Sequence, residues 1–452
     1  MITSKPKHRI KRMLPGDLPQ PGELPETSAD DASAFEAAGT AAPPQATRPP
    51  WVRQVMDFVA QEMPAEARVE NIAQLHKLLR RALLIEHATI PPYLTALYSL
   101  KDGSNLESAQ IIRAVLVEEM LHMILAANVL NAVGGEPLVN EPRFIPSYPL
   151  SLTELLEPNT DDEDSKVLSH LASAARAGAA AAADDAGGGG TKEVRVNILK
   201  FSKKAIDTFV AIETPEPPGP HGGSGPVSTI GQFYTLIIDG LERLEEEARR
   251  RGRTIFTDDP ARLARQLGPE HYYGSGGGAF YVTNLETARD ALGEIICQGE
   301  GFKEICYREG TDLGEYEELG HYFRFMQIKK GRYYAAGDKP GDDPTGPPLR
   351  VDWNQVYDMK PNPRLRDLRH DHGLEALGRS FNATYLRLLD QIQRAFTGEP
   401  DALQGAVVTM FELKYSAAEL LNIPLGAAGQ SAGPIFGPGP RHKLKTENRQ
   451  KP

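Results

Sequence analysis

The chain has 452 residues, of which 40% are hydrophobic and 25% are charged, an ordinary globular composition with room for roughly two or three compact units. Its formal net charge of −11 argues against nucleic acid or an anionic membrane as the main partner, and no run approaches the roughly 20 apolar residues that a membrane span needs. Its two cysteines and a basic N-terminus without an apolar signal region predict a cytoplasmic protein without a disulfide scaffold.

The first part of the chain predicts a leader followed by a helical hairpin. Residues 1–50 are rich in Pro, Ala and acidic side chains, so we expect a disordered leader. Apolar residues then recur at helical spacing through 69–90, where the helix meets Pro91-Pro92 and is expected to stop or kink. A turn at 101–105 precedes a second long helix that is expected to end at Gly134-Gly135.

The rest of the chain alternates between apolar helices and loops rich in Gly, Pro or Ala. Helices are expected in VRVNILKFSKKAIDTFVAIE, VSTIGQFYTLIIDGLERLEEEARRR, LETARDALGEIICQGEGFKEICYREG and EYEELGHYFRFMQIKKG, and at about 373–396 and 401–422. Because strand-type alternation is scarce, we expect a mainly α fold. The predicted units are the leader 1–50, a helical domain 51–335 with a low-complexity insert at 161–191, an extended segment with a helix pair packed on the bundle at 336–426, and a flexible tail 427–452.

One short motif occurs twice, as EEMLH at 118–122 and as EELGH at 317–321. On a helix, residues three apart share a face, so Glu119 lies beside His122 and Glu318 lies beside His321. Of the eleven histidines, only these two follow a glutamate by three residues. Glu and His at this spacing form the ligand pair of dinuclear metal sites in helical bundles, where carboxylates bridge the cations and imidazole completes each coordination sphere. The repeat therefore predicts two bound metal ions.

Such a site also needs one glutamate from each of two further helices. Glu86 is the only acid in its apolar helix after residue 70, and in the predicted hairpin it faces Glu119. A lone acid among apolar residues is costly to bury unless something pairs with it. If 285–308 and 315–331 form a second hairpin, facing positions allow either Glu300 or Glu304 as the remaining ligand.

Residues next to these ligands have simpler explanations. Glu118 and Glu317 lie off the shared face, so we expect them to be exposed or to contact the ligands from outside. His87 follows Glu86 and is expected to be structural. Tyr93, two turns beyond Glu86, is either a group behind the ligands or, more simply, a core tyrosine with a satisfied hydroxyl.

The sequence resembles the ferritin-like domain family typified by iminophenylpyruvate dimer synthase, in LLRRALLIEHATIPPYLTALYSL, VEEMLHMILAANVLNAVGGEP, IICQGEG and ELGHYFRF. The resemblance runs with gaps from about residue 70 to 330, and the dimer synthases themselves are much longer chains. It implies a ferritin-like four-helix bundle with long loop insertions and additional C-terminal helices. Mapped onto this sequence, it implies the metal ligands Glu86, Glu119, His122, Glu300, Glu318 and His321, and so favours Glu300 over Glu304.

Two hypotheses follow for the function. The first is an enzyme whose non-haem dinuclear centre, of iron or alternatively manganese, uses O2 to oxidise a small organic metabolite in a biosynthetic pathway. The substrate could derive from an amino acid, and Tyr93, behind the ligands, is a weak candidate for a catalytic side chain. The second is a non-catalytic ferritin-like module that has a structural or partner-binding role, with or without metal. A storage ferritin is disfavoured by the long inserts.

Overall fold

The computed structural model describes residues 69–151, 194–214, 230–272, 277–299, 319–335, 337–339, 341–426 and 429–437. Within these ranges the protein is mainly α-helical. Two short strands in these ranges, β1 (Leu150–Ser151) and β2 (Arg195–Val196), pair as an antiparallel ribbon. The predicted leader and the insert at 161–191 lie outside the described residues. No helix in the described ranges is long and apolar enough to cross a membrane.

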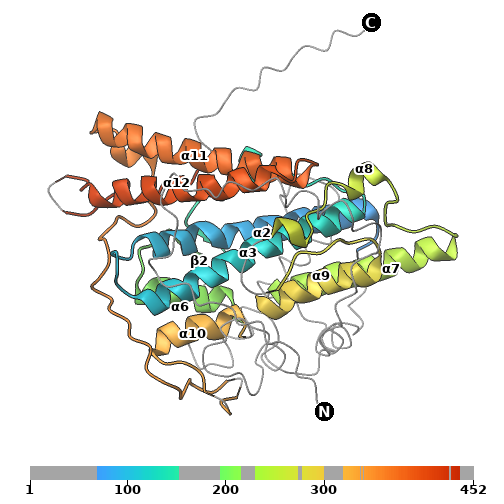
Figure 1. Cartoon of the computed structure of the whole chain (residues 1–452), viewed down its shortest axis with the longest axis horizontal. Coiled ribbons are helices and arrows are strands. Elements are labelled where there is room, and N and C mark those ends of the chain that lie inside the picture. Colours follow the sequence, from blue (N-terminus) through green and yellow to red (C-terminus); the bar gives the residue numbers. More distant parts are fainter. Residues whose placement is uncertain are drawn as a thin grey trace, which may run out of the picture. The chain divides into compact units, whose positions relative to one another are not determined.

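A hairpin of two long helices forms the centre of the bundle. Helix α2 spans Ile72–Tyr98 and α3 spans Leu106–Ala132. The side chain of Asn71 caps α2 by accepting a hydrogen bond from the Gln74 amide. The two helices lie side by side in Figure 1 and are joined by the predicted turn at 101–105. Their apolar faces supply much of the main hydrophobic core.

The prolines were expected to stop or kink the helix, and helix α2 does not stop there but continues through Pro91 and Pro92 to Tyr98. Pro92 lacks the amide that would donate to the Ala88 carbonyl four residues earlier. The Tyr148 hydroxyl donates to that carbonyl instead, at 2.8 Å. The Thr95 hydroxyl donates to the Pro91 carbonyl, also at 2.8 Å. Side-chain donors from inside and outside the helix thus satisfy carbonyls around the prolines.

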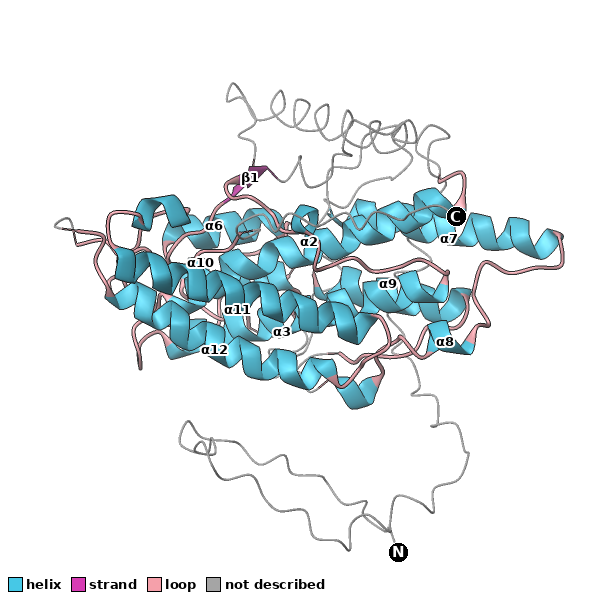
Figure 2. Ribbon diagram, turned by 90° about the horizontal axis from the view of Figure 1, so that it is seen from above, coloured by secondary structure: helices cyan, strands magenta, loops and turns pink. Residues whose placement is uncertain are grey.

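In the part of the chain that the structure describes, four further helices pack around the hairpin: α6 (Lys203–Ile212), α7 (Ile230–Arg250), α9 (Leu285–Gln298) and α10 (His321–Lys330). Helices α6 and α10 pack together beside one end of the hairpin, whereas α7 and α9 pack together beside the other end (Figures 1 and 2). The described parts of α9 and α10 therefore do not form the predicted second hairpin. The remaining helical turns are η3 (Pro142–Phe144), α8 (Pro260–Leu263), η5 (Pro269–His271) and η7 (Leu365–Leu368).

The last two helices are α11 (His372–Phe396) and α12 (Ala402–Asn422), close to their predicted bounds. They pack against each other around a second hydrophobic cluster and lie along the α2–α3 hairpin (Figure 1). The Asn131 side-chain amide on α3 donates to the Phe396 carbonyl at 3.1 Å, which ties the end of α11 to the hairpin.

His87 joins α2 to the C-terminal helix pair. Its side chain is 2% exposed, and its ring stacks on Phe144 with centroids 4.7 Å apart. Its Nε2 and the Tyr385 hydroxyl of α11 share a hydrogen bond of 2.8 Å. His87 therefore has a structural contact, away from Glu86.

We expect the buried His87 to make the fold sensitive to acid. Burial lowers the pKa of His87 to about 3, whereas an unfolded histidine has a pKa of about 6.5. The unfolded state therefore binds a proton first, and the contribution to stability that is complete above pH 6.5 is lost as the pH falls toward 3. Between about pH 6.5 and about pH 5 this loss amounts to about 2 kcal/mol.

Urea unfolding at about pH 7.5 and about pH 5 measures this effect. Wild type should lose about 2 kcal/mol more unfolding free energy than His87→Gln over this interval. His370→Gln removes an exposed histidine and should behave like wild type. Equal losses in wild type and His87→Gln would show that His87 does not titrate on unfolding.

Candidate metal centre

Acidic and imidazole side chains gather inside the bundle where α2, α3, α6 and α10 meet. Glu86 comes from α2, Glu119 and His122 from α3, Glu213 from the residue after α6, and His321 from the first position of α10. None is more than 4% exposed. Buried ionisable groups are costly unless they are paired or bind a cation, so this cluster needs an explanation.

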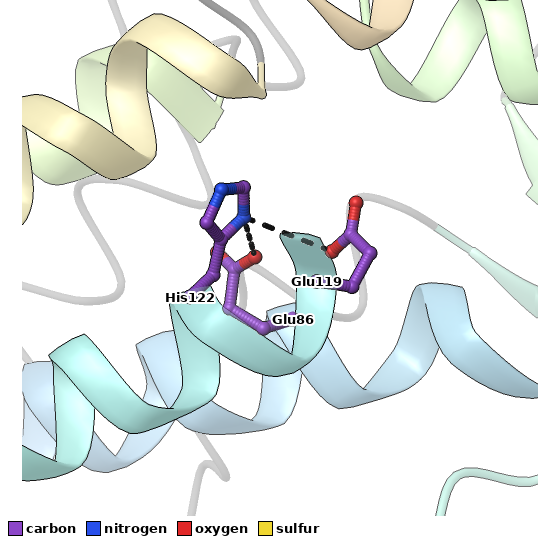
Figure 3. Close-up of side chains that lie close together, drawn as sticks. All are labelled: Glu86, Glu119 and His122. Atoms are coloured by element: carbon purple, nitrogen blue, oxygen red, sulfur yellow. Dashed lines mark hydrogen bonds and ion pairs between the residues drawn. The ribbon is translucent and has the colours of Figure 1, made fainter. Parts of the chain in front are cut away.

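The first three of these side chains form one candidate site, here called the His122 half: Glu86, Glu119 and His122 (Figure 3). The His122 Nδ1 atom lies 3.0 Å from Glu86 Oε2 and 4.0 Å from Glu119 Oε2. One possible ligand atom from each residue lies within 4.8 Å of the others, which is close enough for all three to bind one metal ion.

A second group, here called the His321 half, consists of Glu119, Glu213 and His321. The His321 Nδ1 atom lies 3.0 Å from Glu119 Oε1 and 3.6 Å from Glu213 Oε2. Glu119 belongs to both halves, with Oε2 nearer His122 and Oε1 nearer His321. A carboxylate placed in this way could bridge two metal ions.

The acidic side chains and the hydrogen bonding of the cluster fit bound cations. Four buried carboxyl groups, Glu86, Glu118, Glu119 and Glu213, lie there with the buried guanidinium of Arg324. Burial disfavours charged imidazoles, but the carboxylates of Glu86 and Glu213 outweigh it and raise the pKa values of His122 and His321. Without metal, protons on these side chains balance the carboxylates, and divalent cations would replace those protons. The buried Nδ1 of His321 also has no aligned hydrogen-bond partner among the described residues, as expected for a nitrogen that faces a metal.

Two tyrosines bind the outer oxygens of Glu86 and Glu213, the two carboxylates that each belong to one half only. Tyr234 of α7 donates to Glu86 Oε1 at 2.5 Å, which leaves Oε2 facing His122. Tyr93 of α2 donates to Glu213 Oε1 at 2.5 Å, which leaves Oε2 facing His321. The two carboxylates are thus oriented in the same way, each by a tyrosine from another helix. Tyr93 is therefore placed behind a possible ligand.

The two histidines differ in what their outer nitrogens contact. His321 Nε2 lies 2.9 Å from Glu118 Oε2, and Arg324 Nη1 donates to Glu118 Oε1 at 2.9 Å. His122 Nε2 lies 3.2 Å from the amide oxygen of Gln298. Both imidazoles therefore present Nδ1 to the cluster. Glu118 was expected either to be exposed or to contact a ligand from outside the site. It is fully buried and contacts His321, so the second alternative is the one observed.

Burial and charge shift the pKa values of the two neighbouring glutamates in opposite directions. Burial, together with the charges of Glu213 and Glu86, raises the pKa of Glu119 to about 8. Burial also raises the pKa of Glu118, but the charge of Arg324 and the hydrogen bond from His321 outweigh it and hold that pKa below its usual value. Without metal at neutral pH, Glu119 is therefore protonated and Glu118 is ionised. A cation would have to displace the Glu119 proton.

Some predicted ligands cannot be placed. Glu300, its competitor Glu304, and both Glu317 and Glu318 lie outside the described residues. The helix expected from 315 onward is described only from His321, because Leu319 and Gly320 before it are not helical. Among the described residues, this helix therefore begins at His321. Gly320, a residue of low helix propensity, is the N-cap of α10.

Glu213 was missed by reasoning from the sequence alone. It follows the apolar run KKAIDTFVAI and precedes Thr214, where the chain leaves the helix. The available signal was weaker than the one that identified Glu86, because the helix before Glu213 also carries Asp207. Without a hairpin partner for α6, facing positions could not be used to test it.

A pocket opens beside the cluster. Its polar lining includes Glu86, Glu119, His122, Glu213 and Tyr234. The rest of the described lining is mostly aliphatic: Ile85, Ile212, Ile230, Ile295 and Ile296, with Thr89, Gly231 and Gly299. Apolar walls around a few convergent polar groups are typical of sites for small molecules.

The fold and this cluster define a helical bundle protein with a buried carboxylate–imidazole centre. A family model described as Ferritin-like matches residues 79–330, which is more than half of the chain. The chain therefore belongs to the ferritin-like family, with loop insertions and additional C-terminal helices around the bundle.

Two known proteins are similar to this chain. The 2-imino-3-(indol-3-yl)propanoate dimerase of Chromobacterium violaceum is 24% identical over 416 residues, which cover 83% of this chain and 34% of the relative. The chain thus spans about a third of that relative's length. A ferritin like protein from Caulobacter vibrioides, known from a crystal structure, is 19% identical with a TM-score of 0.48, and the match covers 82% of this chain and 99% of that chain.

Proposed function

We propose that this protein is an O2-dependent oxidase or oxygenase with two metal ions at the buried cluster. The observation that carries the proposal is the position of Glu119, whose two carboxylate oxygens face two different histidines. Glu86 and His122 would complete one half, and Glu213 and His321 the other. Sequence reasoning adds Glu318 and Glu300 as further ligands, and these stay predictions.

The donor set favours iron, with manganese as the alternative. Carboxylate and neutral imidazole ligands suit these metals, whereas thiolate ligands are absent from the described cluster. When bound, the metals would supply the redox chemistry that O2 requires. The protein's own part is to orient ligands: Tyr234 and Tyr93 hold Glu86 and Glu213, as described above.

The described lining of the pocket favours a small substrate with apolar surface. Five isoleucines line its described walls, and its polar groups are concentrated at the cluster. The similar protein from Chromobacterium violaceum is, by its name, a dimerase of an indole-bearing imino acid. We therefore propose an organic metabolite, which could derive from an amino acid, as the substrate class.

Oxygen uptake tests the oxidase proposal. Metal-free full-length protein would be loaded with Fe(II) under anaerobic conditions and then mixed with buffer that contains O2. Wild type should consume O2 in proportion to its bound iron, and faster than the same Fe(II) free in buffer. Glu119→Gln should behave like buffer alone. If wild type binds iron but consumes no more O2 than this variant, the protein is a non-catalytic ferritin-like module.

A further inference from the structure

The outer contacts of the two histidines are not equivalent. His321 Nε2 faces a carboxylate, that of Glu118, at 2.9 Å. His122 Nε2 faces a neutral amide, that of Gln298, at the longer distance of 3.2 Å. The Gln298 amide nitrogen donates to Glu294 Oε1 at 2.7 Å, which fixes the amide oxygen toward His122. Both outer contacts are therefore specific, and they differ in charge.

A carboxylate behind a histidine makes the imidazole a stronger metal ligand than an amide does. The carboxylate accepts the N–H and polarises the ring, and loss of such a partner costs about 10–100-fold in metal affinity. Glu118 is itself fixed by Arg324 in a fully buried pair, so its oxygen cannot swing away from His321. The His321 half thus has a rigid, anionic support that the His122 half lacks.

The two halves also differ in how many of their residues line the pocket. All three ligands of the His122 half line it, namely Glu86, Glu119 and His122. Of the His321 half, Glu213 and the shared Glu119 line the pocket, but His321 is not among the described lining residues. A molecule in the pocket would therefore meet the His122 half more fully.

From these two asymmetries we propose that the centre loads in order. The His321 half takes the first metal ion and holds it tightly, and the His122 half takes a second, exchangeable ion that faces the substrate pocket. Glu118 and Gln298 set this order as positioning residues, because each acts through a histidine. This inference rests on the proposed dinuclear centre and assigns different roles to its two ions.

Single-site variants make it possible to measure each half by itself. The metal-free full chain is titrated with Mn(II) under anaerobic conditions, and electron paramagnetic resonance measures the free ion. Glu86→Gln leaves only the His321 half intact, and Glu213→Gln leaves only the His122 half intact. We expect Glu86→Gln to bind Mn(II) at least about tenfold more tightly than Glu213→Gln, from the size of outer-contact effects.

Exchanging the outer contacts should then shift the two affinities in opposite directions. Added to Glu86→Gln, Glu118→Gln should weaken binding about 10–100-fold. Added to Glu213→Gln, Gln298→Glu should tighten binding about tenfold, a gain that a folding defect cannot produce. Equal affinities of the two single variants, or no gain from Gln298→Glu, would overturn the ordered loading but leave the dinuclear centre. No Mn(II) binding by wild type would overturn both.

Discussion

Glu119→Gln is expected to abolish binding of both metal ions at once. Glu119 is the residue shared by the two halves, and each of its oxygens faces a different histidine. An amide keeps the shape of the side chain but offers neither the negative charge nor two equivalent oxygens for bridging. Variants of the unshared ligands, Glu86 and Glu213, should each retain one ion.

The fold should tolerate this substitution. Burial raises the pKa of Glu119 to about 8, so at neutral pH the metal-free protein already contains a neutral side chain there. Gln resembles this protonated form, and Thr89, which donates to Glu119 Oε2 at 3.0 Å, can donate to the amide oxygen instead. The unfolding free energy of the metal-free protein should therefore change by no more than about 1 kcal/mol.

Metal content after dialysis against excess Fe(II) or Mn(II), measured by mass spectrometry, checks this prediction. Wild type should retain two ions per chain and Glu119→Gln none, a loss larger than either neighbouring variant shows. Glu136→Gln, which changes an exposed glutamate just after α3, serves as the matched control and should retain both ions. Retention of one ion by Glu119→Gln would mean that Glu119 does not bridge.

Arg324→Met is expected to cause the largest loss of stability. Arg324 is 1% exposed, and its guanidinium is the cation beside the fully buried Glu118, at 2.9 Å. Its Nε also donates to the Leu319 carbonyl at 2.6 Å, just before α10. Removing one partner of a buried ion pair leaves an uncompensated charge and costs about 3–5 kcal/mol.

The double variant Arg324→Met with Glu118→Gln separates charge from packing. Replacing both members of a buried pair by neutral groups of similar size is often neutral, so the double variant should recover most of the lost stability. Urea unfolding of metal-free protein gives the three free energies. If the double variant is as unstable as Arg324→Met, the loss comes from the shape of the arginine and its contact with Leu319, and the account of the ion pair is wrong.

Local patterns were sufficient to predict the first half of the bundle. Apolar spacing and the turn at 101–105 place α2 against α3, and this hairpin brings Glu86 to Glu119 and His122. The bounds of α11 and α12 follow from the same periodicity. Each of these features depends on residues close in sequence, or on two helices joined by a short turn.

The second half depends on contacts that sequence spacing does not encode. Helix α10 packs on α6, more than a hundred residues earlier in the chain, and not on the described part of α9. This packing is what brings Glu213 to His321. The same limit applies at Pro92, where a hydroxyl from Tyr148 satisfies the Ala88 carbonyl and lets α2 continue. Neither partner could be found without the tertiary structure.

The most direct test of the dinuclear centre is anomalous X-ray diffraction at the iron edge from crystals of the full chain grown anaerobically with Fe(II). We predict two anomalous peaks inside the bundle, one next to Nδ1 of His122 and the other next to Nδ1 of His321, with Glu119 between them. The absence of any peak at this cluster, in crystals that contain excess Fe(II), would contradict the account.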